Sequence, residues 1–298
     1  MKILVLGGGD SPERLVSLRS AKFVSESLRA AGYDVDEYDP IDGYEFLDKI
    51  DKSTIVFPIL HGVGGEDGFV QQELESRGLK YLGSTSGAAK ISFDKHSAKQ
   101  IMAEVGIPLA AGDAVNEKSY STHDLIKKPH VLKVRHGGSS IGTYLVHEPS
   151  EVDNREVAKV FELDQEAIVE ELVIGTEITV PILGDMALPV IEIIPPNHQD
   201  FDYENKYNGK TQELCPPISI SKEIQIKAQE LSLKVHKSLG CRHWSRVDII
   251  VRPDGSMVVL ELNTIPGMSE QSLYPKSAQV HGLNMPDLMK KFVSLVNS

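Results

Sequence analysis

One stretch near the C-terminus, RVDIIVRPDGSMVVLELN at residues 246–263, constrains the fold more than any other part of the chain. An Asp-Gly pair between two runs rich in β-branched residues is a strong signal for a two-residue β-hairpin turn, so we place Asp254 and Gly255 in the turn. Side chains two residues apart share a face of a strand. Counting back from the turn, the hairpin has a polar side, on which Asp248 faces Glu261 and Arg246 faces Asn263, and an apolar side, formed by Val247, Ile249, Leu260 and Leu262.

The opposed acids of this hairpin require compensation. Directly opposed side chains have Cβ atoms about 4.5–5.5 Å apart, and like charges in that position destabilise a sheet. Mg²⁺ is the simplest compensating group, because it takes carboxylate and amide oxygens and completes its coordination with water and phosphates. The alternative is a solvated face on which Arg246 neutralises one acid, which is the usual situation for surface charge. The hairpin alone does not decide between the metal site and the solvated face. A turn one residue longer would break the pairing of the two acids.

The N-terminal part of the chain predicts an α/β unit. Residues 2–6, 55–60 and 79–82 are short apolar runs of the kind that form buried strands. A glycine-rich loop follows the first run, and we expect Ser11 and Pro12 to be the N-cap and first residue of a helix that ends at Gly32. Buried strands that alternate with helices indicate a parallel sheet covered on both faces.

The pattern changes at Asp94 and predicts α+β structure from there on. The expected elements are a helix over 94–105, strands over 131–134, 143–146 and 167–171, a hairpin over 177–194, a helix from Ser221 to Gly240 and a last helix over 285–296. Residues 195–217 form a polar stretch, and so long an irregular segment usually acts as a lid. We expect domains at 1–93, 94–178 and 179–298, the last carrying the lid loop 195–217.

A glycine-rich loop in the second unit suggests an anion site. The run KVRHGGSSIG at residues 133–142 joins two predicted strands through three glycines and two hydroxyls. Successive backbone N–H groups in such a loop wrap an anion, although a plain flexible hairpin loop is the commoner explanation. Neither GxGxxG nor GxxxxGK[ST] occurs in the chain, so neither a dinucleotide fingerprint nor a P-loop is indicated.

The charge balance and the cysteines limit the partners. The chain has 31 Lys and Arg against 43 Asp and Glu, a net charge of −12, which argues against nucleic acid. A phosphate ligand then needs locally placed cations, for which Lys95, Lys133 and Lys206 are candidates. Cys215 and Cys241 are too few for a disulfide framework, and no apolar run approaches the roughly 18–20 residues that cross a bilayer. We expect a cytoplasmic protein with no membrane partner.

Seven ordered motifs carry a resemblance to a known family. They lie at residues 11–17 (SPERLVS), 61–68 (HGVGGEDG), 94–95, 138–142, 203–207 (YENKY), 246–248 and 261–268 (ELNTIPGM). Together they resemble the D-alanine–D-alanine ligases, ATP-grasp enzymes of peptidoglycan synthesis, over essentially the whole chain. The resemblance implies an α/β and α+β protein with the ATP-grasp fold, in which an N-terminal parallel-sheet domain precedes a two-part ATP-grasp domain. It also implies a homodimer that joins two D-alanine molecules through an acylphosphate at the expense of ATP.

The resemblance further implies an ATP site with two Mg²⁺ or Mn²⁺ ions. The residues that match the metal ligands are Asp248, Glu261 and Asn263. Those that match ATP contacts are Lys95 and Lys133 for the phosphates, Ser139 and Ser140 in the loop over the triphosphate, Glu170, Glu171 and Val173 for adenine, Glu177 for ribose and Lys206 on the closing lid. The family often has lysine at the position of Glu171, and only a backbone contact would survive that difference.

Two amino-acid subsites follow from the same resemblance. The matching catalytic set is Glu13, Ser139, Tyr207, Arg246 and Gly267, and the matching amino-acid contacts are Glu13, His61, Ser272 and Leu273. Glu13 matches the group that receives the first D-alanine's ammonium and is linked by hydrogen bonds to the hydroxyls of Ser139 and Tyr207. Arg246 and the backbone N–H of Gly267 match an oxyanion hole, while Ser272 and Leu273 match the grip on the second carboxylate. Tyr207 favours D-alanine as the acceptor, because relatives that make D-alanyl-D-lactate usually differ there.

Three other functions are compatible with parts of the sequence. Another ATP-grasp carboxylate–amine ligase would share the phosphate chemistry but use other substrates. A nucleotide-binding regulator without turnover is disfavoured by the intact set Arg246, Asp248, Glu261 and Asn263. A Rossmann dehydrogenase is disfavoured by the missing GxGxxG.

Overall fold

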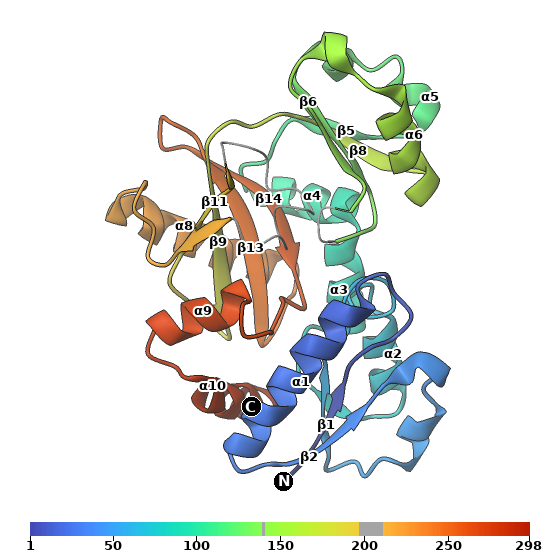
Figure 1. The fold of residues 1–298 in the computed structure, drawn as a ribbon, viewed down its shortest axis with the longest axis vertical. Coiled ribbons are helices and arrows are strands. Elements are labelled where there is room, and N and C mark those ends of the chain that lie inside the picture. Colours follow the sequence, from blue (N-terminus) through green and yellow to red (C-terminus); the bar gives the residue numbers. More distant parts are fainter. Residues whose placement is uncertain (139–140, 197–210) are drawn as a thin grey trace.

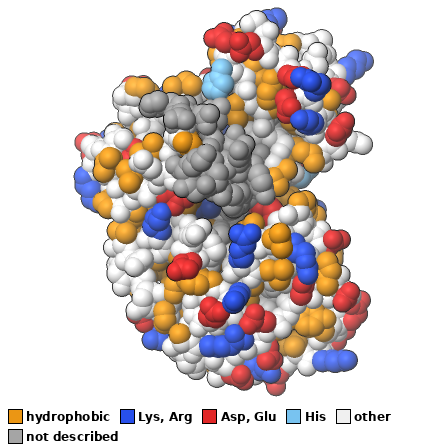
Figure 2. All heavy atoms as spheres, viewed as in Figure 1, with side chains coloured by type: hydrophobic (Ala, Val, Ile, Leu, Met, Phe, Trp, Pro, Cys, Tyr) orange, Lys and Arg blue, Asp and Glu red, His pale blue; other side chains and the backbone are white. Residues whose placement is uncertain are grey.

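The computed structural model of the chain describes residues 1–138, 141–196 and 211–298. Its strands form three sheets, which lie at the bottom, the top right and the left of Figure 1. On the face drawn in Figure 2, the described surface carries acidic and basic side chains interspersed with each other. Within these ranges, no helix has both the length and the apolar character needed to cross a membrane.

The N-terminal sheet is parallel, as the alternation of apolar strands and helices predicts. Its strands, in spatial order, are β2 (Asp34–Tyr38), β1 (Lys2–Leu6), β3 (Ile55–Pro58) and β4 (Lys80–Tyr81). Its helices are α1 (Arg14–Ala30), α2 (Phe69–Ser76) and α3 (Ser86–Phe93). The expected start of α1 at Pro12 is wrong: the Ser11 hydroxyl donates to the His61 carbonyl (2.7 Å) and accepts from the Glu13 N–H (3.2 Å), so a turn precedes the helix.

The central sheet is antiparallel. Its strands, in spatial order, are β5 (Gly112–Val115), β8 (Ala167–Glu171), β6 (His130–Val134) and β7 (Thr143–Val146), and its helices are α4 (Lys95–Glu104), α5 (Glu117–Tyr120) and α6 (Asn154–Leu163). Asp94 caps α4, accepting from the N–H groups of His96 and Ser97, and forms an ion pair with Arg135 at 2.6 Å. This contact holds the start of α4 beside the end of β6.

The third sheet carries the acidic hairpin. Its strands, in spatial order, are β12 (Gln212–Leu214), β11 (Ile191–Ile194), β9 (Thr176–Leu183), β13 (Trp244–Val251) and β14 (Met257–Asn263), with β10 (Met186–Ala187) beside β9. The helices of this part are α8 (Lys222–Ser238), α9 (Leu273–Val280) and α10 (Met285–Val296). The expectation that 195–217 is irregular throughout is wrong, because residues 212–214 pair with β11. Residues 197–210 of that predicted lid lie outside the described residues.

The hairpin has the predicted pairing of Asp248 with Glu261 but a longer turn than predicted. The turn contains three residues, 253–255, since the Arg252 N–H donates to the Ser256 carbonyl at 2.8 Å. Ile249 therefore pairs with Val259, one residue away from the predicted register. A bulge between Asp248 and Ile249 takes up the difference and restores the pairing of Asp248 with Glu261. The bulge also turns Leu260 toward the polar side, where it lines a pocket, so its predicted place on the apolar side is wrong.

A shared core joins the two ends of the chain. One buried cluster contains Ile3 and Phe57 of the N-terminal sheet together with Trp244, Tyr274 and Phe292 from the C-terminal part. The rings of Phe292 and Trp244 meet edge to face at 5.3 Å between centroids. Figure 1 shows α10 beside α1 accordingly. This packing fixes the carboxyl end of the parallel sheet against the hairpin, where the site lies.

Candidate active site

Two cavities of about 610 Å³ each meet at the polar side of the β13–β14 hairpin. The first pocket lies between the N-terminal sheet, the hairpin and the start of α9, and the second lies between the central and third sheets. Both are lined by Lys95, Asp248 and Glu261. Cavities of this volume hold small molecules, and a group bound at the shared residues would be reachable from both.

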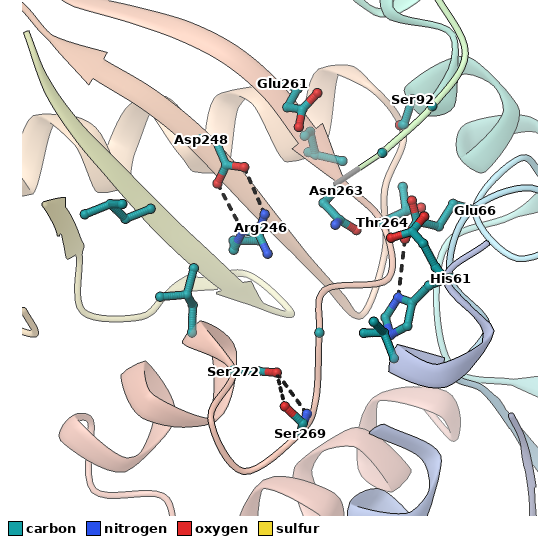
Figure 3. Close-up of a pocket in the computed structure, with 18 of the residues that line it drawn as sticks. His61, Glu66, Ser92, Arg246, Asp248, Glu261, Asn263, Thr264, Ser269 and Ser272 are labelled. Carbon is teal, nitrogen blue, oxygen red and sulfur yellow. Dashed lines mark hydrogen bonds and ion pairs between the residues drawn. The ribbon is translucent and has the colours of Figure 1, made fainter. Parts of the chain in front are cut away.

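Asp248 is a buried carboxylate held by an arginine and a threonine. Its side chain is 9% exposed and accepts hydrogen bonds from Arg246 Nε (3.0 Å), Arg246 Nη2 (2.9 Å) and the Thr179 hydroxyl (2.5 Å). Figure 3 shows this pair with Glu261 and Asn263 on the neighbouring strand. Burial alone would lower the pKa of Arg246, but the Asp248 charge outweighs it and holds this pKa above its usual range.

Of the two interpretations of the acid pair, the solvated face is partly right, and the metal site stays a prediction. Arg246 does neutralise Asp248, as the solvated-face alternative requires, but the pair is buried rather than solvated. Glu261 has Lys95 3.8 Å away as a second compensating cation. Within the described ranges, no three Asp, Glu, His or Cys side chains converge on one point. The oxygen donors of Asp248, Glu261 and Asn263 nevertheless suit a hard divalent cation, and all three line the first pocket.

Buried lysines line the second pocket. The Lys133 ammonium forms an ion pair with Oε2 of Glu170 at 2.6 Å, and Lys99 forms one with Oε1 of the same residue. Burial lowers the pKa of Lys95, whereas for Lys133 the attraction of Glu170 and Glu261 outweighs burial and raises the pKa. These lysines are cations that phosphates can contact in an acidic protein, although Glu170, Asp248 and Glu261 line the same pocket.

The other predicted ATP contacts fall on the same pocket or outside the described chain. Glu170, Glu171, Val173 and Glu177 line the second pocket beside Ile250 and Leu260. The Glu171 side chain pairs with Arg252 at 2.7 Å, an arrangement that suits a backbone rather than a side-chain contact with a ligand. Ser139, Ser140, Lys206 and Tyr207 lie outside the described residues.

The first pocket contains two further buried acids. Glu13 and Glu66 are each 8% exposed, and His61 Nδ1 lies 3.5 Å from Glu66 Oε1. Burial raises the pKa of Glu66, and the neighbouring Glu13 charge adds to the effect. Gly62 has φ +72°, and a Cβ there would lie 2.7 Å from the Glu13 carboxylate. The positive φ favours glycine here, and the missing Cβ leaves room for the Glu13 carboxylate.

The other end of the first pocket is suited to a carboxylate. Ser272 is the N-cap of α9, and both Ser272 and Leu273 line the cavity. The Ser272 hydroxyl accepts from the Ser269 N–H at 2.9 Å. A Cβ on Gly267 would lie 3.0 Å from the Ser272 hydroxyl, so glycine permits the close approach of this loop. Free N–H groups at the start of a helix attract an anion.

Three residues of the site were not assigned a role from sequence. Lys99 lies four residues after Lys95, so helical periodicity could have placed both on one face of α4. Glu66 belongs to the 61–68 motif but is buried only because the loop folds onto His61. Thr179 reaches Asp248 across the β9–β13 pairing, which no local pattern predicts.

The fold and the site together define a class of enzyme. A nucleotide-sized pocket lined by buried lysines adjoins, through paired carboxylates, a pocket with an arginine and a helix N-terminus. With the three sheets in this order along the chain, these are the features of the ATP-grasp class, the fold class expected from the sequence.

Comparison with known proteins narrows the class to a family. A sequence model described as "D-ala D-ala ligase C-terminus" matches residues 101–294. A D-alanine–D-alanine ligase from Nitratidesulfovibrio vulgaris is 38% identical over 99% of this chain and 98% of its own length. One from Desulforudis audaxviator is 37% identical over 99% and 98%. The chain therefore belongs to the D-alanine–D-alanine ligase family, and the resemblance drawn from the motifs is confirmed.

Comparison with solved structures supports the same fold and family. A D-alanine–D-alanine ligase from Bacillus anthracis complexed with ATP has a TM-score of 0.85 and 30% identity, covering 100% of this chain and 97% of that one. The VanG D-Ala:D-Ser ligase from Enterococcus faecalis has a TM-score of 0.85 and 28% identity, covering 99% of both chains. The predicted ATP-grasp fold is confirmed by these neighbours.

Proposed function

We propose that this chain uses ATP to join two D-alanine molecules to D-alanyl-D-alanine, releasing ADP and phosphate, for peptidoglycan precursor synthesis. The observation that carries the proposal is the meeting of the two pockets at Lys95, Asp248 and Glu261. Such a junction would let a phosphoryl group pass from a nucleotide in one cavity to a carboxylate in the other. Family membership at 38% identity supports the same activity.

The second pocket is the proposed site of ATP. Lys95 and Lys133 reduce the repulsion between the triphosphate and the carboxylate of the first D-alanine, which otherwise prevents their approach. Glu170, Glu171, Val173 and Glu177 are proposed around the adenosine, and Ser139, Ser140 and Lys206 around the phosphates. Transfer of the γ-phosphoryl group to the carboxylate gives an acylphosphate and ADP.

The first pocket is the proposed site of both amino acids. Glu13, with His61 beside it and Ser139 and Tyr207 as proposed partners, receives the first ammonium, while Ser272 and Leu273 receive the second carboxylate. The free amine of the second D-alanine attacks the acyl carbon, and phosphate leaves. Arg246 and the Gly267 N–H are the proposed donors to the oxyanion of that step, and one such donor is typically worth about 2.7–4 kcal/mol.

Asp248, Glu261 and Asn263 are the proposed ligands of two Mg²⁺ or Mn²⁺ ions. Their oxygens match the preference of these ions, and the pair of carboxylates lies where both pockets meet. Bound there, divalent cations would neutralise charge that develops on the phosphates.

The direct test is ADP release with a panel of single D-amino and D-hydroxy acids, together with the mass of the product. D-alanine alone should support ADP release in step with dipeptide formation. A second set pairs D-alanine with D-serine or with D-lactate; D-serine is included because a structural relative is named a D-Ala:D-Ser ligase. Turnover that requires D-serine or D-lactate would show a different acceptor, and ATP binding without ADP release would show a regulator instead of an enzyme.

Three further expectations, on domains, compartment and oligomeric state, belong to the same proposal. We propose domains at 1–93, 94–178 and 179–298; the first two sheets each lie within one of these domains, and the boundary after residue 178 falls inside β9 of the third sheet. The two free cysteines suit a reducing cytoplasm. A homodimer follows from the family resemblance, and sedimentation equilibrium tests it.

A further inference from the structure

Lys99 is a buried cation beside the second pocket, and it has no part in the proposed ligation chemistry. It follows Lys95 by one turn of α4. Its side chain is 14% exposed and its ammonium pairs with Oε1 of Glu170. The Lys133 ammonium pairs with the other oxygen, Oε2, at 2.6 Å. Glu170 thus bridges a lysine from α4 and a lysine from β6.

Glu170 needs a cation in every state of the site. Its side chain is 4% exposed, and a buried carboxylate left without a counter-charge is strongly destabilising. Burial alone would raise the pKa of Glu170, but the charges of Lys133 and Lys99 outweigh it and hold this pKa below its usual range. The carboxylate therefore stays charged and keeps its attraction for both ammonium groups.

This arrangement creates a competition for Lys133. The same ammonium that pairs with Glu170 is the one proposed to contact the phosphates of ATP, and a phosphate oxygen must draw it away from the carboxylate. We propose that Lys99 is a positioning residue of the ATP site, which neutralises Glu170 so that the Lys133 ammonium becomes available to the phosphates. The inference rests on the proposed function for the identity of the ligand.

The positions of the two lysines suit these two roles, in which Lys99 neutralises Glu170 and Lys133 contacts the phosphates. Lys133 lines the second pocket, whereas Lys99 contacts Glu170 without lining either cavity. Lys99 is thus placed behind the carboxylate, where it can remain when Lys133 turns to a ligand. With methionine at position 99, Lys133 would be the only described cation on Glu170, and its transfer to a phosphate would leave the carboxylate unpaired.

The test is a double-mutant cycle on nucleotide binding without D-alanine. Calorimetry measures Kd for a non-hydrolysable ATP analogue with Mg²⁺ in wild type, Lys99→Met, Glu170→Gln and the double variant. Lys99→Met should raise Kd about tenfold in the wild-type background but less than twofold in the Glu170→Gln background, where no carboxylate competes. Lys99→Arg keeps the charge and should stay within about threefold of wild type. In steady-state assays Lys99→Met should raise KM for ATP with kcat within about threefold.

Lys159→Met is the matched control, because Lys159 is 64% exposed on α6 and pairs only locally with Glu156 among the described residues. An equal loss of affinity in both backgrounds, or no loss in wild type, would overturn the inference. If Lys99→Met alone does not fold, a double variant that folds and binds like Glu170→Gln supports it, and one that also fails overturns it. A wild-type chain that does not bind the analogue would instead contradict the proposed function.

Discussion

Arg246 and Asp248 pair with each other, although each is proposed to serve a different ligand. The two hydrogen bonds from Arg246 to Asp248 use two of the five N–H donors of a guanidinium. The remaining donors can meet an oxyanion without breaking the pair. The pairing also holds the guanidinium in place before substrate arrives, which is what stabilisation of a transient charge requires.

Replacing Arg246 by alanine should act mainly on kcat. We expect a fall of about 10²–10³-fold, the usual effect of removing one oxyanion donor, with a smaller change in KM. Arg246→Lys serves as the comparison, because it retains a counter-charge for Asp248 but loses the fork that makes both bonds. Steady-state kinetics with D-alanine varied gives the two constants. A change confined to KM would remove Arg246 from the oxyanion hole.

Glu261→Gln should raise the Mg²⁺ concentration needed for half-maximal activity. The effect should reach at least the roughly 10–100-fold that follows loss of a group supporting a metal site. Asp248→Asn tests the same role but also leaves Arg246 buried without its counter-charge, so it should lower stability too. Glu223→Gln on the exposed start of α8 is the control. Activity near wild type at limiting Mg²⁺ in both site variants would refute the metal assignment.

At the scale of elements, the hairpin shows how far sequence patterns reach. The Asp-Gly signal predicts a hairpin and the β-branched runs predict its strands, and both are confirmed. Turn length and bulge position were beyond reach, because a three-residue turn and a two-residue turn fit the same residues and differ only in backbone geometry. The Asp248–Glu261 pairing was predicted correctly only because the bulge offsets the longer turn.

The turn itself depends on Gly255, which has φ +81°. Alanine at this position meets no close atom, since its Cβ would lie 3.5 Å from the Ile224 side chain, so the cost is the left-handed backbone alone. We expect Gly255→Ala to lower the free energy of unfolding by about 1–2 kcal/mol. Gly87→Ala is the matched control: it lies within α3 in open space and should raise stability by up to about 1 kcal/mol. Urea unfolding compares them, and equal effects would contradict the role of the turn.

At the scale of the molecule, the joining of the sheets was the least predictable feature. Apolar periodicity identifies Phe57 and Phe292 as core residues but does not say that they share one core across 235 residues of sequence, an inference that requires the packed structure. No sequence pattern predicts the polar contacts between the N-terminal and third sheets either. Gly83 N–H donates to His243 Nδ1 at 3.0 Å, and Arg242 Nε donates to the Gly83 carbonyl at 2.7 Å.

Two buried histidines, His236 and His243, make the stability of the fold depend on pH. Burial lowers the pKa of His243 to about 4, and it lowers the pKa of the buried His236, which pairs with the Ser245 hydroxyl at 2.7 Å, to about 4 as well. In an unfolded chain a histidine has a pKa of about 6.5. Below that pH the unfolded chain takes up protons that the folded chain does not. The free energy of unfolding therefore has its full value above pH 6.5 and falls as the pH approaches 4.

For His236 the loss over this range should be of the order of 3 kcal/mol, from about 1.4 kcal/mol per pKa unit. Urea unfolding at pH 7, 5.5 and 4.5 measures the combined loss from His236 and His243. His243→Asn retains an acceptor for the Gly83 N–H, tolerates the φ of 65° at this position and does not titrate, so its stability should fall less steeply than that of wild type. His281→Asn, at an exposed position, should follow wild type. Because the carboxylates titrate alike in all three proteins, identical slopes would mean that the His243 contact does not carry the pH dependence.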